Sequence, residues 1–453
     1  MLTFIIGIVL LITGVLFIAT FRGLILLETS VLMIIIGLVL PYLTFLLPEN
    51  CSFQKSNGRI LIFGLIALVV QLILAQFFYD VFNFTQWLTF YRFFERGING
   101  YSYAFSHKIF DMFPYPPILL AFLAFGNSLS TFSGGGFFQL FFKLPFIFSN
   151  ILGGYIVYKI IIFLRDDQGL AEKAFCLYVF SPLLILVTSV QGEFDSFVVT
   201  LTVLAAYCLI AKKSIWLGGL LLGVGIATKL YPIFLLPFFI IYLRRIKNAA
   251  LFVILAFLPL ALVSAPFLIL SPQAYWNIVL NSGGGVGSFS PFSILGPELA
   301  FSTLVATIPM YVAIGILFLV RFRKYGDDLI LNSLLCLLVV YVLSPVTHEN
   351  YAVWMLPFAV IEISEIKHLH LVSFLPFINM LMFVGTPNNG SGLFYWSSFI
   401  TGKSIAASDV FLPNPSLRLG LSPFLIFCFV LVCAYVLIAN SKRKSNNARA
   451  VFG

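Results

Sequence analysis

The chain has 453 residues and a formal net charge of +9. It is 61% hydrophobic and only 9% charged, whereas soluble domains are roughly 45–50% apolar. This composition excludes an ordinary soluble protein. The basic residues are scattered as doublets and triplets in short loops between apolar segments, which excludes a nucleic-acid-binding patch and leaves no nucleic acid among the expected partners.

Apolar segments recur from Leu2 to Ala439, many of them near the ~20 residues that cross a bilayer. No long polar block separates them, so we expect one integral membrane domain over 1–453. The sequence predicts an all-α polytopic transmembrane helical bundle of about 12–14 spans. Residues 1–59 are expected to add two N-terminal spans, because the start lacks the cleavage site of a signal peptide.

Basic residues in short loops predict the orientation of the spans, because cytoplasmic loops carry an excess of Lys and Arg. The loops between the basic ones are then expected to lie outside the cell membrane, with both termini in the cytoplasm. These predicted outer loops are 79–115, 191–195, 228–232, 271–300, 344–351 and 386–417. Segment 114–126 contains two adjacent prolines and is short, so we interpret it as an outer juxtamembrane helix and 137–164 as the true crossing.

Polar side chains at the predicted outer ends of the spans are the candidate site. Charged groups beside a bilayer are costly, so each is a functional candidate, although any one of them can be a solvated loop charge. Six such clusters on one predicted face make chance a weaker explanation. Their members are Asp80, His107, Asp111, Gln191, Glu193, Asp195, Lys229, His348, Glu349 and Tyr351.

Asp80 follows an apolar segment over 60–78. Its carboxylate can accept a proton from an incoming hydroxyl, or it can be a helix-terminal polar group that faces water. The loop that follows, 79–115, is aromatic and carries charges of both signs, which favours a folded outer catalytic loop over a linker. Aromatic faces beside carboxylates suit sugar rings.

The other clusters also allow two interpretations. Asp195 and Ser196 favour a helix N-cap, which would leave Glu193 unexplained; a pair of carboxylates can instead hold a sugar or a metal. Lys229 lies at a turn between two short apolar segments, where its ammonium can point at a phosphate or extend to the membrane surface. His348 is followed by Glu349 and can bind a phosphate oxygen or a hydroxyl.

Taken in order, five features resemble the GT-C superfamily of multispanning glycosyltransferases, which use polyprenyl-phosphate-linked sugars. They are Asp80, "YPP" from Tyr115, "QGEFDS" from Gln191, "GIATKLYPIFLLP" around Lys229 and "SPVTHENYAVWMLP" around His348. Within the superfamily the chain is most similar to polyprenyl-phosphate-mannose-dependent mannosyltransferases, including the catalytic subunit of glycosylphosphatidylinositol mannosyltransferase I and its prokaryotic relatives. The shared elements are Lys-x-Tyr-Pro and an acidic motif at "QGEFDS".

The resemblance implies an inverting glycosyltransferase that moves a hexose, with mannose favoured, from a polyprenyl or dolichyl phosphate to a glycan, lipid or protein acceptor at the extracytoplasmic face. Asp80 would be the catalytic base. The family's Asp-x-Asp form is absent, so Asp80 acts alone or with Asp111 or Glu193. Lys229 and Tyr231 would contact the lipid phosphate, and Tyr115 would bind substrate. No cofactor is predicted; a divalent metal and an accessory membrane subunit are left open.

Two other functions compete with sugar transfer from a lipid phosphate. A transporter or flippase for lipid-linked sugars would also use charges at the membrane boundary, but transporters tend to show internal repeats and charges near the bilayer midplane. We find no repeat in this sequence. A polysaccharide polymerase or ligase would be a sugar-transfer enzyme with a larger lipid-linked donor.

Overall fold

The computed structural model describes residues 57–109, 112–134, 137–280, 303–324, 328–344, 349–363 and 394–396. Within these ranges the chain is helical apart from short connections and one pair of three-residue strands, which confirms the all-α prediction. Two of the candidate site residues, Asp111 and His348, lie outside the described residues. The two spans predicted before residue 57 also lie outside them, as do most of the predicted outer loops 271–300 and 386–417.

Among the described residues, four helical segments are long and apolar enough to cross a membrane, which confirms a polytopic helical protein. They are Gly58–Gln76 in α3 (Asn57–Phe77), α7 (Phe138–Arg165), Gln168–Gln191, and α13 (Ile246–Leu270). The third runs through α8 (Gln168–Val179), α9 (Pro182–Ile185) and the π-helix η1 (Leu186–Gln191). Helix α7 occupies the segment 137–164 that the sequence predicts as a crossing, and it is long enough to span a membrane.

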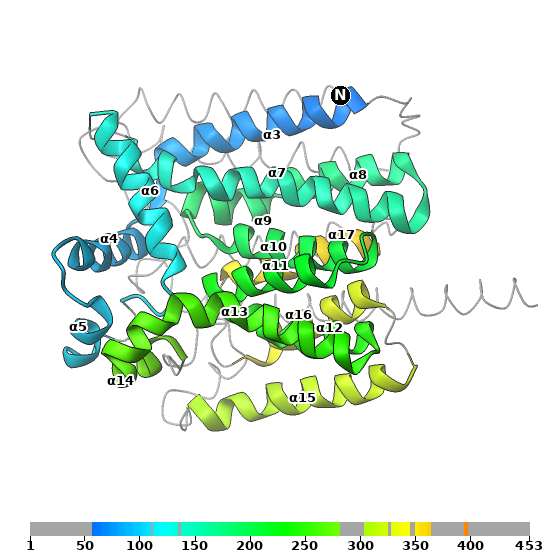
Figure 1. The fold of residues 1–453 in the computed structure, drawn as a ribbon. Coiled ribbons are helices and arrows are strands. Elements are labelled where there is room, and N and C mark those ends of the chain that lie inside the picture. Colours follow the sequence, from blue (N-terminus) through cyan, green and yellow to red (C-terminus); the bar gives the residue numbers. More distant parts are fainter. Residues whose placement is uncertain are drawn as a thin grey trace, which may run out of the picture.

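The described residues contain further apolar helices besides these four segments. They are α10 (Asp195–Ile210), α11 (Ile215–Thr228), η2 with α12 (Tyr231–Leu235 and Leu236–Leu243), α15 (Thr303–Lys324), α16 (Leu329–Leu343) and α17 (Ala352–Ile363). Helices α10 and α17 pack against α7, and α7 and α8 lie between them and α3 (Figure 1). The number of spans in the whole chain therefore stays a prediction.

Close backbone packing holds two of these helices together. On α11, a Cβ at Gly223 would lie 2.8 Å from the carbonyl oxygens of both Leu255 and Ala256 on α13. A Cβ at Gly219 would also lie 2.8 Å from the Leu255 side chain. Small residues let helices approach closely in a membrane, where apolar burial alone gives little driving force.

The helices α4 (Val81–Glu95), α5 (Gly100–Ser106) and α14 (Pro272–Tyr275) gather at one end of the bundle, and α6 (Ile118–Phe132) crosses that end at a steep angle to α7 (Figure 1). Helix α6 occupies most of the segment that the sequence predicts as a juxtamembrane helix. It has 15 residues, fewer than the ~20 of a full span.

The predicted outer loop 79–115 is folded over its described residues. Strand β1 (Phe78–Asp80) pairs antiparallel with β2 (Phe394–Trp396). Phe90 stacks on Phe113 with ring centroids 4.3 Å apart, and the hydroxyl of Tyr101 donates to the carbonyl of Tyr115 at 2.7 Å. These contacts confirm a structured first loop and hold the segment before α6 against α4 and α5.

Candidate active site

Five connections at this end of the bundle carry polar side chains. They are the end of α3, the end of η1, the start of α10, the end of α11 and the 3-10 turn η5 (Glu349–Tyr351). The side chains are Asp80, Glu193, Asp195, Lys229 and Asn350, with exposed fractions of 2, 4, 0, 8 and 6%. Buried polar groups need hydrogen-bond partners, so the chemical role of each of these five side chains depends on the groups that it binds.

One amide joins two of the carboxylates. The side-chain Nδ2 of Asn83 donates to Asp80 Oδ2 at 3.0 Å and to Glu193 Oε1 at 2.6 Å. The main-chain N of Asn83 also donates to Asp80 Oδ1 at 3.3 Å. We call Asp80, Asn83 and Glu193 the Asp80 group. Of the second carboxylates that the sequence left open for Asp80, the structure brings Glu193 close, and Asp111 lies outside the described residues.

Glycine at position 192 lets the chain present Glu193. The main-chain N–H groups of Gly192 and Glu193 both donate to the carbonyl of Val187, at 3.2 and 3.0 Å. Gly192 has a φ of +89°, and a Cβ there would lie 2.5 Å from the ring of Phe84. Only glycine meets both conditions. The buried Gln191 ends η1 immediately before this turn.

Lys229 and Asp195 form a buried ion pair. Lys229 Nζ lies 2.9 and 3.0 Å from the two carboxylate oxygens of Asp195. Asn350 Nδ2 donates to Asp195 Oδ2 at 2.7 Å, and Trp354 Nε1 donates to Asp195 Oδ1. We call Asp195, Lys229, Asn350 and Trp354 the Lys229 group. Asp195 makes no side-chain cap on α10, and Lys229 points into the bundle, so neither the N-cap nor the surface interpretation is correct.

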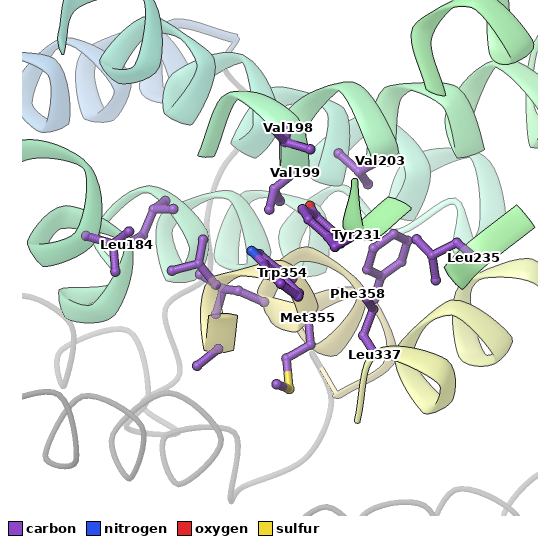
Figure 2. Close-up of a cluster of buried hydrophobic side chains, with 14 of the residues drawn as sticks. Leu184, Val198, Val199, Val203, Tyr231, Leu235, Leu337, Trp354, Met355 and Phe358 are labelled. Atoms are coloured by element: carbon purple, nitrogen blue, oxygen red, sulfur yellow. The ribbon is translucent and has the colours of Figure 1, made fainter. Parts of the chain in front are cut away.

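Aromatic rings enclose the Lys229 group. Trp354 lies between Tyr231 and Tyr351, with ring centroids 3.9 Å apart on each side and interplanar angles of 3° and 23°. Figure 2 shows Tyr231 lying flat against Trp354. The ammonium of Lys229 lies 5.1 to 5.7 Å from the ring centroids of Phe194, Tyr351, Trp354 and Tyr115. Cation–π attraction therefore adds to the ion pair.

Tyr115 lies within reach of both groups. Burial raises the pKa of its hydroxyl well above the usual value of 10.0. Electrostatic interactions with the acidic groups of Glu193, Tyr351, Asp195 and Asp80 raise this pKa further, in that order of size. Lys229 Nζ is 5.7 Å from the centroid of the same ring, so Tyr115 lies beside the Lys229 group and within electrostatic range of the Asp80 group.

The structure does not bring His107 to either group through any contact of the described residues. His107 is exposed and follows α5, its Nδ1 lies 2.9 Å from the carbonyl of Tyr103, and its ring stacks on Tyr103 at 4.0 Å. The backbone of Glu349 begins η5, next to Asn350. Substrate contacts by His107, His348 and Glu349 stay predictions.

Several residues of the site could not be picked out from the sequence. Lys143 is fully buried in α7, and the signal for it was a lysine inside the apolar stretch 137–164. Asn83 belongs to an N-glycosylation sequon, but its side chain is bound to two carboxylates. Asn350 and Trp354 are neutral, so no charge marked them as partners of Asp195.

The described residues hold no group of three or more His, Cys, Asp or Glu side chains that could bind a metal ion. In the Asp80 group, the Asn83 amide bridges the two carboxylates. The arrangement is that of a hydrogen-bonded acid pair, in which one carboxylate can take a proton while the amide fixes its orientation.

Comparison with known proteins identifies the family. Residues 113–345, more than half of the 453, match the model of Glycosyltransferase family 87. GPI mannosyltransferase 1 of Candida albicans is 30% identical over 137 residues, which cover 29% of this chain and 32% of that protein. Its namesake in Debaryomyces hansenii is 31% identical over 150 residues, 32% of this chain and 34% of that protein.

A third relative is the polyprenol-phosphate-mannose-dependent alpha-(1-2)-phosphatidylinositol mannoside mannosyltransferase of Mycobacterium tuberculosis. It is 27% identical over 178 residues, 37% of this chain and 40% of that protein. The chain thus spans only 32 to 40% of the length of the curated relatives it matches. The family match includes Glu193, Asp195 and Lys229 and begins after Asp80. On this match the chain belongs to glycosyltransferase family 87.

Proposed function

We propose that this membrane protein transfers a hexose, namely mannose, from a polyprenyl or dolichyl phosphate to an acceptor hydroxyl on the extracytoplasmic side. The observation that carries the proposal is the Asp80 group, a buried carboxylate oriented by an amide beside a second carboxylate in a chain of a glycosyltransferase family. The donor is supported by the printed name of the mycobacterial relative, which depends on polyprenol phosphate mannose.

In the proposed reaction Asp80 takes the proton of the acceptor hydroxyl. The acceptor oxygen forms a bond to the anomeric carbon, opposite the phosphate. The bond between that carbon and the phosphate oxygen breaks with its electrons going to the phosphate, so the configuration inverts. Asn83 orients the Asp80 carboxylate, and the negative charge of Glu193 makes a proton on Asp80 more favourable.

Lys229 is the proposed partner of the leaving phosphate, which gains negative charge in the transition state that a fixed cation offsets. Asp195 keeps its bonds from Asn350 and Trp354 when the ammonium turns toward a phosphate. Tyr351 and Tyr115 are proposed to pack against the sugar, because both are partly exposed and lie beside Lys229.

The proposed outer side is the end of the bundle that carries both groups. The opposite end has basic connections, including Arg165 at the end of α7, Lys212 and Lys213 before α11, and Arg244 and Arg245 before α13. Such connections are typical of the cytoplasmic side.

The test is transfer of labelled mannose from polyprenyl-phosphate mannose in membranes that contain the full chain, which retain any accessory subunit. Asp80→Asn keeps the size of the side chain and removes the base, so we expect transfer to fall by about 10²–10⁴-fold. Glu95→Gln is the matched control, because Glu95 is an exposed carboxylate on α4 whose side chain accepts a bond from Asn127. We expect this control to stay within about twofold, as for most surface changes.

Equal transfer by the wild type and Asp80→Asn would remove Asp80 from the mechanism. Absence of transfer by either protein would overturn the proposed donor and favour a flippase or a polymerase. Movement of a fluorescent lipid-linked sugar across vesicles that contain the protein would then separate those two.

A further inference from the structure

Lys143 is a buried cation that the proposed chemistry does not use. It lies in the second turn of α7 and is 0% exposed. Its ammonium nitrogen lies within hydrogen-bond distance of four main-chain carbonyl oxygens, those of Ala75 at 3.4 Å, Ser189 at 3.0 Å, Val190 at 3.3 Å, and Phe78. The same nitrogen lies 5.6 Å from the ring centroid of Phe84. A buried charge is costly unless such partners surround it, so this position is specifically built.

The four oxygens belong to two stretches of the chain, the junction of α3 with β1 and the end of η1. Ala75 is in the last turn of α3 and Phe78 begins β1, while Ser189 and Val190 are in the last turn of η1. Last-turn carbonyls lack intrahelical partners and carry partial negative charge, which favours a cation there. One ammonium therefore binds the C-terminal ends of α3 and η1 together.

Both carboxylates of the Asp80 group follow these ends directly. Asp80 comes two residues after Phe78, and Glu193 comes three residues after Val190. Between them, a Cβ at Gly192 would lie 2.6 Å from Cε of Lys143, so the lysine stem packs against the turn that presents Glu193. The ammonium is thus placed to fix the spacing of the two carboxylates.

The distribution of charge around the Asp80 group also supports a role for Lys143 beside the two carboxylates. The Asp80 group brings two acids together at one amide, and the charge of Lys229 is matched by Asp195. Lys143 donates to neutral carbonyls, so its positive charge remains to act on the nearby carboxylates. The titratable side chains that lie around Asp80 are Tyr79 on β1, Glu193 after η1, Tyr115 before α6 and Lys143 on α7.

We propose that Lys143 is a positioning residue for sugar transfer: its ammonium ties β1 to η1, sets the spacing of Asp80 and Glu193, and favours the ionised base. The proposal rests on the proposed function. Lys143 exchanges no proton and touches no substrate. Its effect is on the rate of the chemical step and on the pH at which the base is lost.

The test compares Lys143→Met, Lys143→Arg and, as the matched control, Lys159→Met in the membrane transfer assay. Lys159 lies on the same helix and packs on the rings of Tyr155 and Tyr158. For Lys143→Met we expect kcat to fall at least about 30-fold, with the KM for polyprenyl-phosphate mannose within about threefold. The acid limb of its pH profile should move upward by about one pH unit, because an ionised Asp80 is less favoured without the cation.

Lys143→Arg keeps the positive charge, so its kcat should be at least about tenfold higher than that of Lys143→Met. The acid limb of its pH profile should stay at the wild-type position. Lys159→Met should match the wild type. Transfer by Lys143→Met within threefold of the wild type would overturn the inference. If Asp80→Asn is inactive in the same assay, the proposed function stays intact. A loss with an unmoved acid limb and no recovery by arginine would show a packing role only and would also overturn it.

If Lys143→Met is not recovered as a monodisperse protein in detergent, Lys143→Arg decides. Folded and active Lys143→Arg with an unchanged acid limb supports the inference, and folded but inactive Lys143→Arg overturns it. Absence of transfer by the wild type would overturn the inference together with the proposed function.

Discussion

The Asp80 group and the Lys229 group lie at the same end of the bundle and are both buried, but their charges are arranged in opposite ways. In the Lys229 group one carboxylate receives bonds from a cation, an amide and an indole, so its charge is neutralised and its oxygens are well supplied with donors. In the Asp80 group the side-chain amide of Asn83 donates to two carboxylates, those of Asp80 and Glu193.

The difference separates a group whose opposite charges compensate each other from a group in which like charges lie close together. A buried ion pair with good geometry is self-consistent, and removing either partner leaves a costly lone charge. Two neighbouring carboxylates around one amide are electrostatically unfavourable, and a carboxylate in such an environment has a perturbed affinity for protons, as functional groups often do. We therefore expect substitutions in the Lys229 group to reduce stability most, and substitutions in the Asp80 group to reduce activity most.

The largest expected effect on stability is that of Asp195→Ala. It leaves the Lys229 ammonium buried without its carboxylate, which costs about 3–5 kcal/mol. Chemical denaturation in detergent measures the change, and the double variant Asp195→Ala/Lys229→Met should recover part of the loss because no charge is then left alone. Asp80→Asn should leave stability within about 1 kcal/mol of the wild type. If Asp195→Ala lowers the free energy of unfolding by less than about 1 kcal/mol, the Lys229 group does not contribute more to stability than the Asp80 group.

Gly192→Ala should have the next largest effect, because Gly192 joins the two groups through the turn between η1 and α10. A positive φ costs a non-glycine residue about 1–2 kcal/mol, and the overlap with Phe84 and Lys143 adds about 1–3 kcal/mol. Gly97→Ala is the control, since Gly97 has a φ of +71° and a Cβ there would meet no atom within 4 Å. Equal losses of stability in the two variants would show that the close packing around Gly192 contributes nothing.

The smallest effect is expected for Tyr115→Phe and depends on pH. The pKa of Tyr115 is raised in the folded protein, so an unfolded chain ionises this group near pH 10 while the folded chain does not. Stability from this group is therefore fully present below pH 10 and declines as the pH rises above it, by at most about 1.4 kcal/mol per pH unit. Melting temperatures at pH 8 and pH 10.5 should fall less for Tyr115→Phe than for the wild type. Identical falls would place the hydroxyl in water and away from both carboxylate groups.

Much of the architecture followed from patterns of short range. Apolar length predicted helices such as α7 and α13, and the polar residues that end the spans marked Asp80, Glu193, Asp195 and Lys229. These predictions succeed because a bilayer imposes one length and one polarity on every helix that crosses it. The partners were less predictable. Asn83 and Glu193 are 110 residues apart, and Asp195 and Trp354 are 159 apart, so no local pattern relates them.

The sequence by itself determined that this protein is a helical membrane protein with acidic and basic side chains at span ends, and its ordered motifs determined the family resemblance. Only the tertiary structure decided which carboxylate belongs with which donor. It assigned Lys229 to Asp195, linked Asp80 to Glu193 through Asn83, and placed the unsuspected Lys143 beneath both ends. The physical reason is that burial makes every polar group find a partner, and the partners available depend on how distant helices pack.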